Sequence, residues 1–271
     1  MKRLILAAVS TLTALLLPGC LQSETTITLQ KDGSGTVVEK TTLGAQMLGM
    51  LEQFAAMGGE NAKDPVAEMF SEEKAKAKAA KMGEGVTFEK SEPLTAGANK
   101  GAKVTYKFTD INKLKVSPGD GMSDMSPMAG APGAPAKPEQ RPVAFNYAGG
   151  KLTVTMPEPE KPAADAPKPE GMPDLEDNPQ AEAMMKQMLG DMKMSFKLVV
   201  EPGIAETDAT HHEGKTITLM EMEMGKLLEK PDTFKKLAAV DQSNPAAAME
   251  VFKGIEGVKV ETKKEITVTV D

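Results

Sequence analysis

Cysteine, tryptophan and histidine are nearly absent from this chain. It has one cysteine, no tryptophan and two histidines, and aromatic residues make up 4% of its 271 residues. A single cysteine cannot form an intrachain disulfide, so packing must hold the folded part together. The net charge is −7 at pH 7, so nucleic acid would be repelled. We therefore expect no nucleic-acid partner and no aromatic platform for stacking sugars.

Residue patterns that carry catalysis are also scarce. No serine lies in a GxSxG setting, and no glycine-rich phosphate loop follows a strand pattern, because the GEG segment at 83–85 is typical of a helix stop. Carboxylates are plentiful, with 39 acidic residues, so a pair of them carries no information alone. We expect a protein that is not an enzyme and needs no cofactor. A hydrolase with an unrecognised site is an alternative.

The N-terminus has the pattern of an export signal. Lys2 and Arg3 precede the apolar run 4–17, which is shorter than the roughly 20 residues a membrane-spanning helix needs. The run ends in LPGC, residues 17–20, which resembles the lipobox of bacterial lipoproteins. The resemblance implies cleavage between Gly19 and Cys20 and lipidation of the Cys20 sulfur by a diacylglycerol and palmitate-type chains. The alternatives are a plain signal peptide with a chance cysteine, or a buried helix.

This resemblance implies an organisation and a location. Residues 1–19 would be a signal peptide, 20–24 a lipidated tether, and 25–271 a single domain. Each buried methylene contributes about 0.8 kcal/mol, so two or more acyl chains anchor a protein stably. Leu21, rather than an aspartate, follows the cysteine, and by the sorting rule of enterobacteria this favours the outer membrane. We expect a lipid-anchored protein of the cell envelope, facing a periplasmic or similar aqueous compartment.

Two segments lack any apolar periodicity. Residues 117–142 are rich in Pro, Gly, Ser and Ala, and residues 157–174 are rich in Pro and charges. Such composition is typical of long mobile loops. Because they flank a short strand pair, we interpret them as disordered low-complexity insertions within one domain, with two joined subdomains as the alternative.

The remaining sequence alternates between strand and helix patterns. One-sided alternation is the mark of half-buried antiparallel strands. It occurs at 27–29, 86–88, 104–108, 143–147, 152–156, 196–200, 217–219, 258–260 and 266–270. Helices are predicted at 46–57, 65–82, 179–192, 231–239 and 245–253, three of which begin with Asp-Pro or Asn-Pro caps. The predicted fold is α+β, an antiparallel meander of hairpins with four to five packed helices.

The segment DGSG, residues 32–35, raises the question of a metal loop. Placing Gly33 sixth in a calcium loop puts Glu39 twelfth, but Thr28 and Gln30 then occupy positions that require carboxylates. Asp-Gly between two alternating segments is instead a strong hairpin signal. We predict a turn here, and a second one at the glycine pair of NYAGGKLTV.

Histidine and methionine offer a second metal hypothesis. His211, His212 and Glu213 are adjacent, and neighbours on a strand point to opposite faces, so we expect exposed loop residues. Met220, Met222 and Met224 share one face of a strand, and thioethers bind Cu(I), so periplasmic copper handling is an alternative function. The favoured explanation is that flexible methionines fill core space in place of aromatic residues, and a flexible apolar surface for a lipid or partner is a further alternative. Ile217 and Leu219 have the opposite parity, which predicts a bulge near Leu219 or burial on both faces.

Three segments together look like uncharacterised bacterial lipoproteins with an LppM-like domain. They are ITLQKDGSGTVVE, KGAKVTYKFTDINKLKV, and SFKLVVEPGIAETDATHHEGKTITLMEMEM. The resemblance implies an envelope protein with a lipid-associated or surface role, and it transfers no catalytic residues. We therefore expect a non-enzymatic module that binds a lipid or an envelope protein, or has a structural role.

Overall fold

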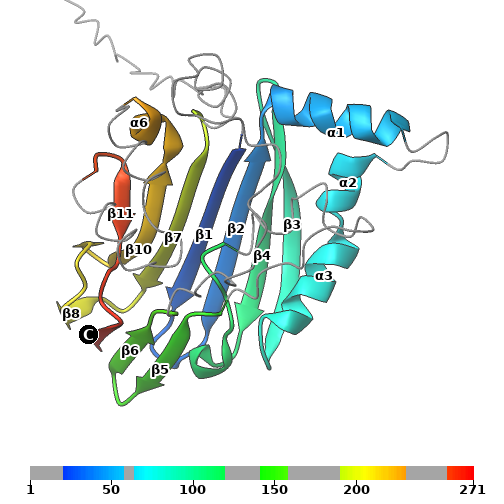
Figure 1. Cartoon of the computed structure of the whole chain (residues 1–271). Helices are drawn as coiled ribbons and strands as arrows, with labels where there is room; N and C mark the ends of the chain where they lie inside the picture. The colour runs from blue at the N-terminus through cyan, green and yellow to red at the C-terminus, as the bar shows by residue number, and fades with distance from the viewer. Residues whose placement is uncertain (1–20, 58–63, 120–140, 158–189, 230–254) are drawn as a thin grey trace, which may run out of the picture.

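The largest element of the structure is a mixed β-sheet. The computed structural model describes residues 21–57, 64–119, 141–157, 190–229 and 255–271. The strand order is β11-β10-β7-β1-β2-β4-β3, with β9 beside β10 (Figure 1). β1 and β7 are parallel, and the other neighbours are antiparallel. The strands are β1 (Leu21–Leu29), β2 (Gly35–Leu43), β3 (Val86–Ala96), β4 (Asn99–Phe108), β7 (Lys193–Val200), β9 (His212–Glu213), β10 (Thr216–Glu223) and β11 (Val258–Val260).

A smaller sheet and a few helices complete the described fold. The smaller sheet has the order β5-β6-β12-β8, with β5 (Ala144–Ala148), β6 (Lys151–Thr155), β8 (Ile204–Thr207) and β12 (Glu265–Val270). The helices are α1 (Ala45–Met57), α2 (Pro65–Met69), α3 (Glu72–Lys81), α6 (Met224–Leu228) and the 3₁₀ turn η1 (Ile111–Lys113). In Figure 1, α1 starts at one end of the large sheet and points sideways past its β3–β4 edge, and α3 runs along the β3–β4 side. Across the described ranges, no helix has the length and apolarity needed to span a bilayer.

The large sheet has a covered face and an open face. The covered face carries Ile27, Val37, Phe196, Leu198 and Ile217, all fully buried. They pack against inward residues of the small sheet and neighbouring turns, and we call this cluster the sealed core: its other members include Phe108, Leu114, Val143, Phe145, Leu152, Val154, Ile266 and Val268. The open face carries the residues of opposite parity, which are mostly threonine, lysine and glutamate, such as Thr26, Lys103 and Lys197. The large sheet is therefore amphipathic, as strand alternation requires.

A second apolar cluster occupies the other end of the covered face. Leu21, Leu43, Leu48 and Leu51 are buried there, where β1 begins, β2 ends and α1 starts. Met47, Val66, Met69, Phe70 and Met192 pack against it. On α1, Leu51 lies four residues after Met47 and three after Leu48, and all three face this cluster, as the apolar side of an amphipathic helix does.

The predicted α+β fold is wrong. The described residues are mostly β, in a large mixed sheet with few helices, rather than an antiparallel meander with four to five packed helices. The parallel pairing of β1 with β7 joins residues far apart in sequence, which local alternation cannot reveal. The helix predicted at 65–82 is interrupted at residues 70–71, where Ser71 caps α3. The helices predicted at 231–239 and 245–253 lie outside the described residues, as does 179–189, while 190–192 is not helical.

Local features of the sequence were predicted more accurately. The DGSG segment is the β1–β2 turn: Gly33 has φ +87°, and Asp32 accepts hydrogen bonds from the Ser34 N–H and hydroxyl at 3.0 and 2.6 Å. The turn at Gly149-Gly150 joins β5 to β6, with both glycines at positive φ. A register shift between Thr218 and Met220 confirms the predicted bulge.

The expected tether and insertions are only partly described. Residues 21–24, expected within the tether, belong to β1 and pair with β2 and β7. Residues 120–140 and 158–174, the bulk of the two expected insertions, lie outside the described residues. Val116 and Val143, which bracket the first of them, form an antiparallel bridge.

Candidate functional site

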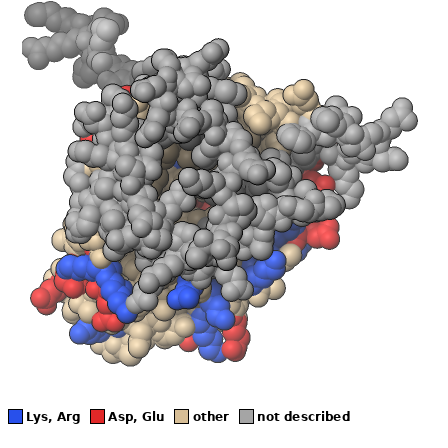
Figure 2. Space-filling view, in the orientation of Figure 1, with Lys and Arg blue, Asp and Glu red and all other residues tan. Residues whose placement is uncertain are grey.

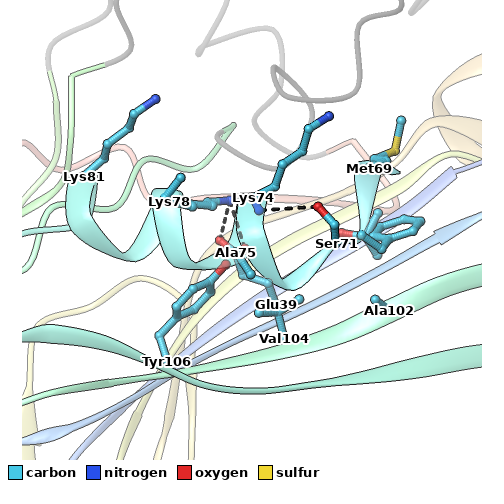
Figure 3. Close-up of a pocket in the computed structure, with 13 residues that line it drawn as sticks. Glu39, Met69, Ser71, Lys74, Ala75, Lys78, Lys81, Ala102, Val104 and Tyr106 are labelled. Atoms are coloured by element: carbon cyan, nitrogen blue, oxygen red, sulfur yellow. Dashed lines mark hydrogen bonds and ion pairs between the residues drawn. The ribbon is translucent and has the colours of Figure 1, made fainter. Parts of the chain in front are cut away.

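A cleft lies between α3 and the covered face of the large sheet. Its volume is about 330 Å³, and we call it the α3 cleft. The sheet contributes its floor and α3 one wall, with the residues before α3 closing one end (Figure 3). The lining residues are Glu39, Thr41, Met69, Phe70, Ser71, Lys74, Ala75, Ala77, Lys78, Lys81, Ala102, Val104 and Tyr106.

The sequence of α3 explains why space remains here. Ser71 caps the helix by accepting a hydrogen bond from the Lys74 N–H at 3.4 Å, and Glu72 and Glu73 occupy the first turn, where the helix dipole favours them. The side chains that α3 turns toward the sheet are Ala75 and Ala79, four residues apart. Alanine is too small to fill the distance that a leucine would bridge, so the helix docks without sealing the interface.

A buried ion pair crosses the cleft. Glu39 lies on the covered face of β2, between Thr25 and Val104 on the neighbouring strands, and is 9% exposed. Lys78 Nζ lies 2.9 Å from each carboxylate oxygen, but only Oε2 accepts a directed hydrogen bond. The phenol of Tyr106 points toward this pair (Figure 3). A charged residue at an inward strand position costs desolvation, and Lys78 offsets that cost.

The rim of the cleft is basic, although the protein is acidic. Lys74 and Lys81 extend away from the sheet, whereas Lys78 turns toward Glu39 (Figure 3). Lys74 Nζ lies 3.7 Å from a Glu68 oxygen, and both side chains are exposed, so solvent weakens that pair. The lining thus combines three lysines and one carboxylate with an apolar floor formed by Ala102 and Val104 and an apolar end formed by Met69 and Phe70.

The open face has a different electrostatic pattern. A hollow of about 270 Å³ there is lined by paired charges. Glu221 lies between Lys197, at 3.3 Å, and Lys259, at 3.1 Å. Burial opposes ionisation of Glu221, but hydrogen bonds from Lys259 and Lys197 together lower its pKa. Hydrogen bonds from Lys226 likewise lower the pKa of Glu223. Each carboxylate that lines this hollow has a lysine partner, so the described residues of the hollow present compensated charges to a ligand.

The residues singled out in the sequence lie elsewhere. Gly19 and Cys20 fall outside the described residues, so the lipidation site stays a prediction. His211 and His212 lie beside β10, where His212 is exposed. The nearby buried carboxylate of Glu261 is occupied by hydrogen bonds from Thr210 and Lys263. Within the parts of the chain that are described, no group of three His, Cys, Asp or Glu residues is placed to hold a metal.

The methionines of β10 divide between two environments. Met220 packs against the sealed core opposite Phe196, and Met222 lies opposite Met194. Met224 begins α6. Their placement at the bulge agrees with core filling, and copper binding stays an untested alternative.

The α3 cleft was not predicted from the sequence. Two features of the sequence could have indicated it. Glu39 has the inward parity of Val37 and Leu43 on β2, and an acidic residue at such a position requires a partner. The segment KAKAKAAK, residues 74–81, places Ala75 and Ala79 four apart between lysines, which indicates a helix with a small inner face and a basic rim.

Comparison with known proteins gives little further guidance. No protein-family model matches the chain, and no curated protein does. Among solved structures, the NMR structure of the folded domain of the Mycobacterium tuberculosis LppM protein is similar over 78% of this chain and 88% of that domain, with 10% identity and a TM-score of 0.30. A similarity at this identity and TM-score assigns neither family nor function.

Proposed function

We propose that this chain is a lipid-anchored, non-enzymatic binding protein of the cell envelope, whose α3 cleft holds an anionic amphiphile. The observation that carries the proposal is the basic rim of Lys74 and Lys81 above an apolar floor, with Lys78 paired to Glu39 inside the cleft. The export pattern and the lipobox-like LPGC support the envelope location, and Leu21 after the cysteine favours the outer membrane. The partners would be the membrane, through the lipid on Cys20, and the ligand of the cleft.

The size and chemistry of the cleft narrow the ligand class. Its volume of about 330 Å³ lies at the lower end of the range of about 300–1,000 Å³ that ligand pockets show. A single acyl chain fits that size better than two. Burying apolar surface contributes about 25 cal/mol per Å², and the rim lysines would add attraction for a phosphate or carboxylate headgroup. A lysophospholipid with an anionic headgroup combines both features.

The cleft favours binding over hydrolysis. A hydrolytic site with two carboxylates requires a second acid near the first. The lining residues include one carboxylate, Glu39, and Lys78 already pairs with it. We therefore interpret Glu39 as the residue that positions Lys78 at the wall of a binding site.

Filling the cleft tests the proposal. Ala75→Leu places a large side chain on the buried inner face of α3, whereas Ala80→Leu adds the same atoms on its exposed outer face. Native mass spectrometry of the purified protein, titrated with lysophosphatidylglycerol, measures the bound fraction. We expect Ala75→Leu to weaken binding by at least about tenfold, which corresponds to about 1.4 kcal/mol, and Ala80→Leu to leave it unchanged.

A lysophospholipid with a neutral headgroup provides a second comparison with lysophosphatidylglycerol. Lysophosphatidylcholine has the same single chain without net charge, so it should bind more weakly than lysophosphatidylglycerol, and Lys81→Gln should reduce that difference. If Ala75→Leu binds lysophosphatidylglycerol as the parent does, the α3 cleft is not the binding site.

A further inference from the structure

The folded sheet begins immediately after the proposed lipidation site. Leu21 pairs with Leu43 of β2, and Gln22 pairs with both Thr42 of β2 and Lys193 of β7. The Leu21 side chain is 6% exposed within the second apolar cluster. Consecutive Cα atoms are about 3.8 Å apart, so Cys20 is attached one residue from a doubly paired strand. No slack separates the anchoring residue from the body of the protein.

One part of the surface at this end of the sheet has no charged residue, whereas Lys193, Glu223 and Lys226 lie at the same end on the other side of β1. We call the uncharged part the α1 end, and it comprises the outer face of residues 45–51 of α1 and the β3–β4 turn at 95–98. Neither stretch contains a charged residue, and the first one along α1 is Glu52. Met50 is 41% exposed, and among the described residues it is the large apolar side chain that stands out to solvent.

The opposite end of the sheet carries charged side chains at its turns, unlike the α1 end. The β1–β2 turn there carries Lys31 and Asp32, and η1 carries Lys113, which pairs with Glu84 at 2.8 Å. Figure 2 shows blue and red side chains interspersed at this lower end, while the described surface around the start of α1 is tan. An uncharged surface has the smallest desolvation cost when it leaves bulk water.

We infer that the α1 end lies flat on the bilayer, with α1 along the headgroups and Met50 directed into them. The inference rests on the lipid anchor proposed above. An acylated Cys20 must sit at the bilayer interface, and with no tether it brings the start of β1 there as well. Because the axis of α1 is roughly perpendicular to the strand direction (Figure 1), α1 lies along the membrane when the strands point away from the bilayer. The partner surface is a neutral or weakly charged bilayer, since residues 45–51 include no lysine or arginine to attract anionic lipid, and Lys193 and Lys226 at the same end of the sheet both pair with Glu223.

This orientation also determines which end of the α3 cleft faces the bilayer. Met69 and Phe70 close one end of the cleft and at the same time pack against the second apolar cluster beneath α1. The apolar end of the cleft therefore faces the α1 end rather than the charged end. An acyl chain leaving the bilayer would meet that end first.

The absence of tryptophan supplies a clean reporter. Met50→Trp places one indole at the α1 end, and Ala148→Trp places one beside the β5–β6 turn, where Ala148 is exposed. Each full-length, acylated variant is reconstituted into vesicles of phosphatidylcholine, with or without brominated acyl chains, and tryptophan emission is recorded. We expect bromine to quench most of the Met50→Trp emission and to leave Ala148→Trp unaffected. Equal quenching of the two, or none in either, overturns the orientation.

A lengthened tether tests whether the short link between Cys20 and β1 causes this orientation. Inserting twelve Gly/Ser residues between Cys20 and Leu21 of the Met50→Trp variant gives a flexible link with a root-mean-square span of about 17–21 Å. Quenching should then fall severalfold, and unchanged quenching overturns the role of the short attachment. The mass of the N-terminal peptide is measured first: an unmodified Cys20 overturns the proposed anchor and this inference together. If Cys20 is acylated but the emission of Met50→Trp is not quenched, the orientation is wrong and the anchor still stands.

Discussion

The covered face of the large sheet meets two neighbours of different character. Toward the small sheet, large apolar side chains such as Phe196, Leu198 and Ile217 meet Leu152 and Val268, and all are fully buried. Toward α3, the same face carries Glu39, Thr41 and Ala102 and meets a helix whose inner residues are alanines. The first contact makes the sealed core, and the second leaves the α3 cleft.

The difference shows that burial and packing density are set separately. Strand alternation decides which residues face inward, and it does so equally in both regions. The size of the facing side chains then decides whether a cavity remains. A helix rich in alanine and lysine gains little from burial and contributes a basic rim instead, which is a useful arrangement for a ligand site and a poor one for stability.

The largest expected effect tests the sealed core. Phe196→Ala removes a ring that is 0% exposed, and such truncations cost about 3–5 kcal/mol of unfolding free energy. Ala75→Leu adds atoms where the α3 cleft has room, so it should change stability by less than about 1 kcal/mol. Urea denaturation followed by circular dichroism measures both. Comparable losses in the two variants would contradict the distinction between a sealed and an open contact.

An intermediate effect is expected at the ion pair. Lys78→Met leaves the Glu39 carboxylate without its partner, and breaking a fully buried pair costs about 3–5 kcal/mol. The two side chains retain 19% and 12% exposure, so we expect a smaller loss of about 2 kcal/mol.

The double variant completes the ion-pair test. Glu39→Met combined with Lys78→Met removes both charges and should recover most of the loss, which urea denaturation of the three variants measures as a coupling energy. If the double variant is as unstable as the sum of the single ones, the pair is not coupled.

The sequence predicted the local structure of this protein better than its assembly. Alternation located the strands around Phe196 and Val268, and Asp32-Gly33 and Gly149-Gly150 predicted two turns, because these signals depend on neighbours within a few residues. The parallel neighbour of β1 lies about 170 residues away in the chain, and no local pattern encodes that choice. The fold class was therefore predicted with too much helix and with an antiparallel sheet.

Only part of the candidate site could be predicted from the sequence. The sequence drew attention to Cys20, the histidines and the methionines of β10, none of which lines the α3 cleft. In the sequence, Glu39 stands out only as the twelfth position of a possible calcium loop, although its inward parity on β2 requires a partner of opposite charge. That partner, Lys78, comes from a separate helix, and pairing across elements follows from packing rather than from spacing.

The smallest expected effect lies on the open face, which adds a third environment to the comparison. Hydrogen bonds from Lys259 and Lys197 outweigh burial and lower the pKa of Glu221 below its ordinary value of 4.5. A carboxyl whose folded-state pKa is lowered stabilises the fold above its unfolded pKa, and that contribution disappears as the pH falls through the folded-state value. Glu221→Gln should therefore cost under about 1 kcal/mol at pH 7 and nothing at pH 2, with the exposed Glu213→Gln as the control. Urea denaturation at both pH values measures the difference. A Glu221→Gln penalty that persists at pH 2 would mean that packing, rather than the lysine partners, stabilises this strand.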